Sequence, residues 1–170
     1  TYNLSSDSIQ NWRRMLNSAG RRIKRHSLIK ASSIRFLEAA ELNNLKKIHL
    51  ISDYIDSRTI EINEYNSNNK IDKSIPINGR NLTNLGIFRK YITEYLYNYP
   101  GLNKDMMMLC RQLQSTSHGV PLEVYAFSHD KRFENYEYIM SDIFDHIIAS
   151  VPYFDLEIFE TITENNLPVA

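Results

Sequence analysis

The stretch from residue 105 to residue 127 most constrains the fold, because it contains two short runs with a period of two residues. Within 105–113 and again within 121–127, side chains alternate as they do along a β-strand, whose successive residues point to opposite faces. Gly119 permits a turn between the runs, and Pro121, which lacks a backbone donor, suits the first residue of a strand. The pattern predicts an antiparallel hairpin.

A helix is predicted on each side of this hairpin. Over 83–98, apolar residues recur at helical spacing, Thr83 can act as the N-cap, and Pro100 ends the helix. A second apolar stripe covers 133–147 and follows Asp130, a candidate cap. Ile139, Phe144 and Ile148 widen this second stripe enough to cover a sheet.

Two further strands are predicted near the ends of the chain. Residues 21–36 are rich in alternating and β-branched side chains, and 155–161 alternate again. The order strand, helix, strand, strand, helix, strand is that of the split βαβ motif. We therefore expect an α+β, ferredoxin-like domain with a four-stranded sheet and two helices on one face.

Residues 38–82 are an insertion after the first strand. Leucine and isoleucine at helical spacing predict a helix over 38–54, whereas 58–66 fits helix or strand, with helix favoured. Residues 66–82 form a polar loop that contains Asn78-Gly79. We expect this insertion to add surface rather than core.

The composition is that of an ordinary globular domain, and its 20 Lys/Arg balance 20 Asp/Glu. No global attraction to nucleic acid follows, and no nucleic-acid partner is expected. The charge is nevertheless uneven. Residues 1–38 hold eight Lys/Arg and two Asp/Glu, whereas 131–170 hold two and eight. Either these are two solvated surfaces, or the ends attract each other within a subunit or between neighbours.

The single cysteine, Cys110, excludes an internal disulfide and lies in an apolar run, which favours a buried thiol in a reducing compartment. No signal peptide is recognisable, and no apolar run reaches the roughly 20 residues of a membrane helix. We expect the chain to be water-soluble. It begins at Thr1 without an initiator Met, and we expect it to be part of a longer protein.

The best catalytic candidates are Asp142, Asp145 and His146, which helical spacing puts on one exposed face. Their oxygens and imidazole could hold the divalent metal of a hydrolase. The simpler interpretation is a solvated face with an Asp142–His146 pair. No phosphate-binding glycine motif and no Cys-x-x-Cys pair occurs. We therefore expect no catalytic residue, no metal site and no cofactor.

The run Arg21-Arg22-Ile23-Lys24-Arg25 is the strongest electrostatic feature and could bind phosphates. Its surroundings lack the aromatic strand signature of an RNA-recognition motif, although the strand order fits that fold. A solvated or acid-paired strand is the simpler interpretation. No evident nucleophile accompanies His26, His118 or His129.

Many short runs of this chain, from about Asn11 to about Phe159, resemble the miniconductance branch of the MscS-type (small-conductance) mechanosensitive channels. Each run alone is a weak match, but so many runs in the same order as in that family make a chance match improbable. The runs are Asn11-Trp12-Arg13, Gly20-Arg21-Arg22-Ile23-Lys24-Arg25, Ser33-Ile34-Arg35-Phe36-Leu37, Glu61-Ile62-Asn63-Glu64, Thr83-Asn84-Leu85-Gly86, Phe88-Arg89, Tyr95-Leu96, Lys104-Asp105-Met106, Arg111-Gln112-Leu113, Gly119-Val120-Pro121-Leu122-Glu123-Val124-Tyr125-Ala126-Phe127 and Ile143-Phe144-Asp145-His146.

The resemblance implies a homo-heptameric channel that opens under membrane tension and relieves osmotic stress. This chain would lie at the cytoplasmic face of the bacterial inner membrane and form the wall of a cage whose portals pass inorganic ions and small solutes. Its partners would be other copies of the subunit, and only the missing transmembrane segments would contact the lipid bilayer. The resemblance divides the chain into 1–20, the end of a central β layer, 21–161, the cytoplasmic α/β domain, and 162–170, a polar tail.

A different class of function stays open. The chain could be a stand-alone split βαβ module that binds RNA or a small regulatory ligand through the basic strand. The upstream sequence of the gene product separates the two: several apolar stretches of about 20 residues favour the channel.

Overall fold

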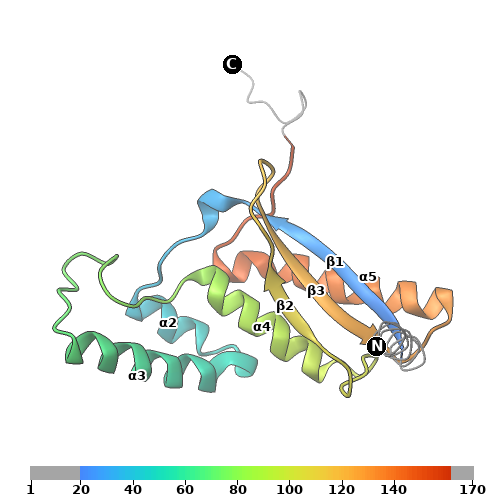
Figure 1. Ribbon diagram of the computed structural model, residues 1–170, viewed down its shortest axis with the longest axis horizontal. Helices are drawn as coiled ribbons and strands as arrows, with labels where there is room; N and C mark the ends of the chain where they lie inside the picture. The colour runs from blue at the N-terminus through green and yellow to red at the C-terminus, as the bar shows by residue number, and fades with distance from the viewer. Residues whose placement is uncertain (1–19, 162–170) are drawn as a thin grey trace, which may run out of the picture.

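A computed structural model describes residues 20–161, and the predictions for 1–19 and for the tail at 162–170 lie outside them. Its sheet has the order β1-β3-β2, with β1 (Arg21–Ile29) and β2 (Leu109–Gln112) both antiparallel to β3 (Val120–Ser128). Figure 1 shows this sheet, with β3 between the other two strands. The predicted hairpin is confirmed, and Gly119 has the positive φ of 121° that its turn requires.

Two helices cover the sheet. α4 (Asn84–Asn98) begins at Thr83, whose hydroxyl accepts a hydrogen bond from the Gly86 N–H at 3.1 Å, so the predicted N-cap is confirmed. α5 (Phe133–Ser150) carries the second stripe. Alternate residues of β3 and the apolar stripes of both helices belong to one buried cluster, so both helices pack on the same face. The chain is thus a mixture of helices and antiparallel sheet, as predicted.

The predicted fourth strand and the ferredoxin-like order that depends on it are not shown within 20–161, where residues 155–161 form only an isolated bridge between Ile158 and Ile29. A turn of 3-10 helix, Val151–Phe154, precedes this segment. The Leu156 N–H donates to the Val151 carbonyl, and the Glu157 N–H donates to Ser33 Oγ. Beside the bridge, the Lys30 N–H donates to the Glu157 carbonyl and the Phe159 N–H donates to the Leu28 carbonyl. Because Ser33 takes the Glu157 N–H, which would continue this ladder, the sheet keeps three strands.

Two local predictions also need correction. The strand predicted over 105–113 is confined to β2, because the Asn103 side chain accepts the Asp105 N–H at 3.0 Å and holds a turn there. Asp130 does not cap α5, which begins after Arg132 without a side-chain cap. Its carboxylate instead accepts the Arg132 N–H and the Asn135 amide.

The insertion is helical, but the helix predicted over 38–54 is broken. α2 (Ala39–Leu45) ends after two turns, Ile48 is extended, and a 3-10 turn (His49–Ile51) leads into α3 (Ser52–Asn68). The break turns Ile51 towards α4, where it is fully buried. The helix favoured over 58–66 is confirmed, and the polar loop follows α3.

The insertion adds to the core, contrary to the expectation that it adds surface. Leu45, Ile51 and Ile55 belong to the same buried cluster as α4 and α5. The loop also packs: the Asn66 amide and the Arg80 backbone exchange two hydrogen bonds, of 2.9 and 3.1 Å. Gly79, at φ +72°, makes this possible, since a Cβ there would lie 2.3 Å from Asn66 Oδ1.

None of the helices within 20–161 is both long enough and apolar enough to cross a lipid bilayer.

Candidate functional site

The predicted cluster on α5 is engaged in packing against α4. His146 is half-buried rather than exposed; its ring stacks on Tyr95 with centroids 3.9 Å apart, and its Nε2 lies 2.6 Å from the Tyr91 hydroxyl. The Tyr99 hydroxyl donates to Asp142 at 2.8 Å. Asp145 is exposed. The helix brings the three together as predicted, but tyrosines of α4 contact His146, and Tyr99, just beyond the end of α4, binds Asp142.

The electrostatics follow from this packing. Burial lowers the pKa of His146, and the nearby Asp142 carboxylate opposes that shift in part. Burial raises the pKa of Tyr95 to about 12, with Asp142 adding to the shift, and both effects also raise the pKa of Tyr99. Within 20–161, no group of three His, Cys, Asp or Glu side chains is arranged to hold a metal ion.

The basic run divides between the two faces of the sheet. Arg21 lies 4.1 Å from the centre of the Tyr136 ring, and Arg25 lies 5.7 Å from that of Phe144, both on α5. Arg22 and Lys24 point to the other face, opposite Phe127 and Tyr125 of β3. Two arginines of the run thus lie against aromatic rings of α5. Neither interpretation from the sequence, phosphate binding or a solvated or acid-paired strand, included this contact.

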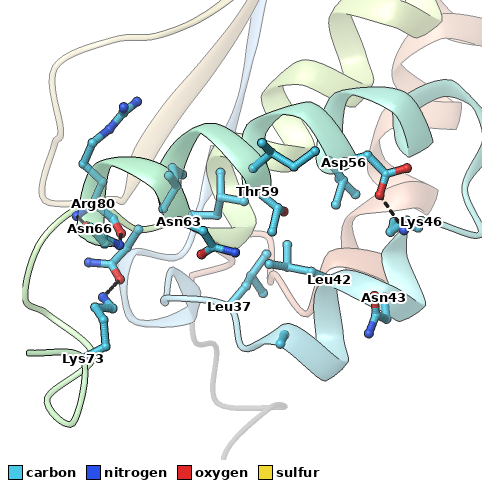
Figure 2. A pocket seen from close by; sticks show the side chains of 16 residues that line it. Leu37, Leu42, Asn43, Lys46, Asp56, Thr59, Asn63, Asn66, Lys73 and Arg80 are labelled. Atoms are coloured by element: carbon cyan, nitrogen blue, oxygen red, sulfur yellow. Dashed lines mark hydrogen bonds and ion pairs between the residues drawn. The ribbon is translucent and has the colours of Figure 1, made fainter. Parts of the chain in front are cut away.

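The described part of the chain contains a cavity of about 650 Å³ in the insertion, between α3 and the segment from Leu37 to Lys46. Figure 2 shows Thr59 and Asn63 of α3 facing Leu37 and Leu42 across it. The cavity exists because α2 is far shorter than α3, so that α3 beyond Thr59 has no helix opposite. Its volume is in the range of small-molecule sites.

Polar groups close the two ends of this cavity. Lys46 and Asp56 form an ion pair of 2.5 Å at one end, while Lys73 and Arg80 lie at the other (Figure 2). The Lys73 ammonium donates to three uncharged oxygens, those of the Pro76 and Asn78 carbonyls and the Asn81 side chain.

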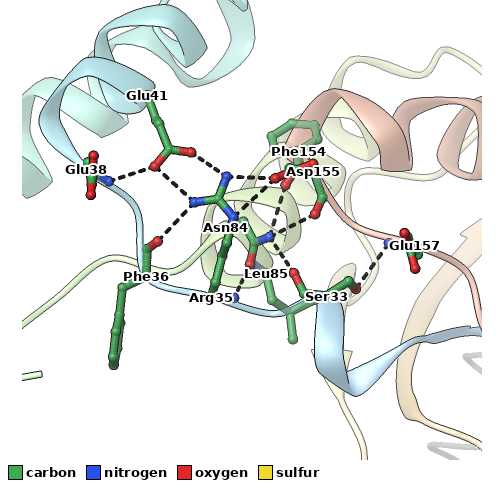
Figure 3. A network of polar contacts seen from close by, with 10 residues as sticks. All are labelled: Ser33, Arg35, Phe36, Glu38, Glu41, Asn84, Leu85, Phe154, Asp155 and Glu157. Carbon is green, nitrogen blue, oxygen red and sulfur yellow. Dashed lines mark hydrogen bonds and ion pairs between the residues drawn. The ribbon is translucent and has the colours of Figure 1, made fainter. Parts of the chain in front are cut away.

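Arg35 is the centre of a polar network that joins three distant segments, shown in Figure 3. Its guanidinium binds Asp155 at 2.8 Å and both carboxylate oxygens of Glu41, one of them at 2.9 Å. The Arg35 hydrogen bond is the largest cause of the lowered pKa of Glu41, and the two carboxylates raise the pKa of Arg35. The network ties α2 to the segment that follows α5.

Asn84 is the buried part of the same network. Its Oδ1 accepts the Arg35 N–H at 2.9 Å, and its Nδ2 donates to the carbonyls of Ser33 (2.9 Å) and Phe154 (3.1 Å). The residue is fully buried. A side chain that satisfies three backbone groups from two distant segments, 33–35 and the turn after α5, has a structural role, and its removal leaves all three groups without this partner.

The uneven charge of the chain is partly neutralised within one subunit. Lys30 pairs with Glu157 at 3.2 Å, and Arg35 pairs with Asp155. Both pairs join the basic N-terminal part to the acidic C-terminal part. This agrees with the interpretation that the two ends attract each other within a subunit.

Sequence reasoning missed the cavity and the role of Asn84. Thr59 offered a signal for the first, because it interrupts the apolar positions Ile55 and Ile62 on one helix face. Asn84 offered none, since an asparagine after an N-cap is ordinary. No protein-family model matches this chain.

Proposed function

We propose that this chain is the cytoplasmic part of a subunit of an MscS-type mechanosensitive channel of the miniconductance branch. In this proposal it is not an enzyme. It forms the wall of a cage at the cytoplasmic face of the bacterial inner membrane, assembled from seven copies, and the channel opens under tension to relieve osmotic stress.

One observation carries the proposal: many short runs, from about Asn11 to about Phe159, keep the order found in that family. The fold supports it in part. β3 lies between β1 and β2 and is antiparallel to both, with α4 and α5 following β1 and β2–β3 in the chain. The proposal also includes the four-stranded split βαβ fold. Its support is the Ile29–Ile158 bridge, which lies on the free edge of β1, where a fourth strand would pair.

The complete gene product that contains this chain tests the proposal. It should include apolar segments of about 20 residues upstream of Thr1. In a bacterial strain without its own mechanosensitive channels, it should raise survival of a sudden drop in osmolarity and give tension-activated currents in membrane patches. The matched control is the same gene without the codons for residues 20–161. A membrane-inserted product that gives neither survival nor current contradicts the proposal.

A second candidate is a binding module for single-stranded RNA. The observation that favours it is the face of the sheet opposite α4 and α5, where Arg22 and Lys24 lie beside Phe127 and Tyr125. Phe127 is buried, however, which leaves Tyr125 as the accessible ring of the pair. Fluorescence anisotropy with labelled single-stranded RNA at low and physiological salt separates the candidates: salt-resistant binding that Tyr125→Leu removes would favour the module.

A further inference from the structure

We infer that the cavity between α2 and α3 is a binding site for a small amphipathic carboxylate, a molecule with an acid group and an apolar body. Nothing in this inference depends on the channel proposal.

The first argument is a buried hydroxyl without a partner. Thr59 Oγ1 is inaccessible to solvent and makes no hydrogen bond to any residue in the described part of the chain. Such a group costs stability, because it has lost its hydrogen bonds to water and has gained none from the protein. Thr59 lines the cavity, and the second χ1 rotamer open to a threonine in a helix would turn this hydroxyl towards a molecule bound there, which can supply the missing acceptor.

A second polar group lies beside it. Asn63 follows Thr59 by four residues, which puts both side chains on the same face of α3. Figure 2 shows both directed into the cavity. The Asn63 side chain is exposed, and its amide forms no hydrogen bond to another residue within 20–161, so it is open to a bound molecule. A hydroxyl and an amide N–H at this spacing can donate to the two oxygens of one carboxylate.

The rest of the lining fits an apolar body. Leu37, Leu42, Ile55, Ile62 and Leu82 contribute side chains to the cavity. The Leu37 N–H donates to the Leu82 carbonyl at 2.9 Å, so the wall that faces α3 is held by backbone pairing rather than by loose loops.

The charge of the lining favours an anion. Three basic residues, Lys46, Lys73 and Arg80, line the cavity together with one carboxylate, Asp56, which is paired with Lys46. The Lys73 ammonium binds only uncharged oxygens, and its field is therefore not cancelled by a bound carboxylate. Arg80 pairs with Glu61, but Glu61 is also bound to Arg58, so one carboxylate faces two guanidinium groups. Cations therefore outnumber carboxylates among the residues that line the cavity.

Octanoate is the probe, titrated into the whole chain at low ionic strength and followed by amide chemical shifts. We expect saturable shifts at α3, at 37–43 and at 80–82, with 1-octanol and octylamine binding more weakly because they lack the acid group. Arg80→Gln should weaken octanoate binding about threefold at low salt and have no effect at high salt, as expected for an exposed charge.

Thr59→Val is the decisive variant, because it keeps the shape of the side chain and removes only the hydroxyl. We expect octanoate to bind about tenfold more weakly, the usual effect of a lost hydrogen bond to a charged group. The ligand-free variant should unfold at a higher temperature than the parent chain, which shows that weaker binding does not come from misfolding.

The matched control is Thr93→Val on α4, whose hydroxyl already donates to the Arg89 carbonyl at 3.0 Å. It should bind octanoate like the parent chain. Three results would overturn the inference: no shift at the cavity, equal affinity for octanol or octylamine, or unchanged affinity after Thr59→Val. Each of these results would exclude a carboxylate as the partner of Thr59.

Discussion

At the residue scale, Asn84 shows how a polar side chain can hold a small domain together. It is buried without a charge and satisfies backbone groups that lie 51 and 70 residues away in the chain. A buried amide of this kind stabilises the fold only as long as every partner is present, since an unpaired buried polar group is costly.

Replacing Asn84 should therefore destabilise the protein strongly. We expect Asn84→Leu, which keeps the size and removes the amide, to lower the free energy of unfolding by about 2–4 kcal/mol. Urea denaturation followed by circular dichroism measures this. Asn98→Leu is the control, because the Asn98 amide is exposed and bonds only to Glu94 one turn earlier, and it should change stability by less than about 0.5 kcal/mol. Equal effects of the two substitutions would show that Asn84 is not a structural centre.

His146 should make stability depend on pH. Burial lowers its pKa below the ordinary value of 6.5, so the folded protein binds the proton less well than the unfolded chain. Neutral His146 therefore makes its full contribution to the free energy of unfolding above pH 6.5. This contribution is lost as the pH falls through the lower pKa of the folded state. Stability should thus decrease on acidification below about pH 6.5, before most carboxylates titrate.

Denaturation at a series of pH values tests this. His146→Phe keeps a ring to stack on Tyr95 and should flatten the decrease, whereas His129→Phe, in an exposed loop, should leave it unchanged. An unaltered slope in His146→Phe would assign the pH dependence to other groups.

At the scale of elements, the insertion is integral to the core rather than an accessory. The break between α2 and α3 directs Ile51 and Ile55 towards α4, and Arg35 fastens α2 to the segment after α5. If the insertion lay on the surface, nothing would require a break, and the single helix predicted over 38–54 could form.

Two substitutions of isoleucine by alanine within the insertion test whether it belongs to the core or only adds surface. Ile51→Ala should lower the free energy of unfolding by about 2–5 kcal/mol, because it opens a cavity in the core. Ile77→Ala removes the same atoms from a side chain that is 66% exposed and should cost less than about 0.5 kcal/mol. A small effect of Ile51→Ala would show that the insertion adds surface rather than core, as the sequence predicted.

At the scale of the whole molecule, the distribution of charge bears on assembly. Lys30–Glu157 and Arg35–Asp155 use part of the opposite charge of the two ends inside one subunit. Exposed pairs of this kind stabilise a protein little, but charge that remains unpaired can steer association between copies.

If the channel proposal holds, the isolated chain should associate weakly at low salt and dissociate at high salt. Light scattering over a range of protein concentrations measures this. Glu160→Lys, in an exposed residue next to the bridge at Ile158, should reduce the association without affecting the core. A strict monomer at every concentration and salt would mean that self-association requires parts of the protein beyond this chain, or does not occur.

The amino-acid sequence by itself determined α4, α5 and the β2–β3 hairpin, because their periodicity, the Thr83 cap and the Gly119 turn depend on neighbours within a few residues. Only the tertiary structure decided the partners of Asn84, the stacking of His146 on Tyr95 and the cavity at Thr59, since these join elements far apart in the chain. It also limited the pairing of 155–161 with β1 to one bridge, because Ser33 takes the Glu157 N–H that a longer ladder would need. Such competition between distant acceptors leaves no local pattern in the sequence.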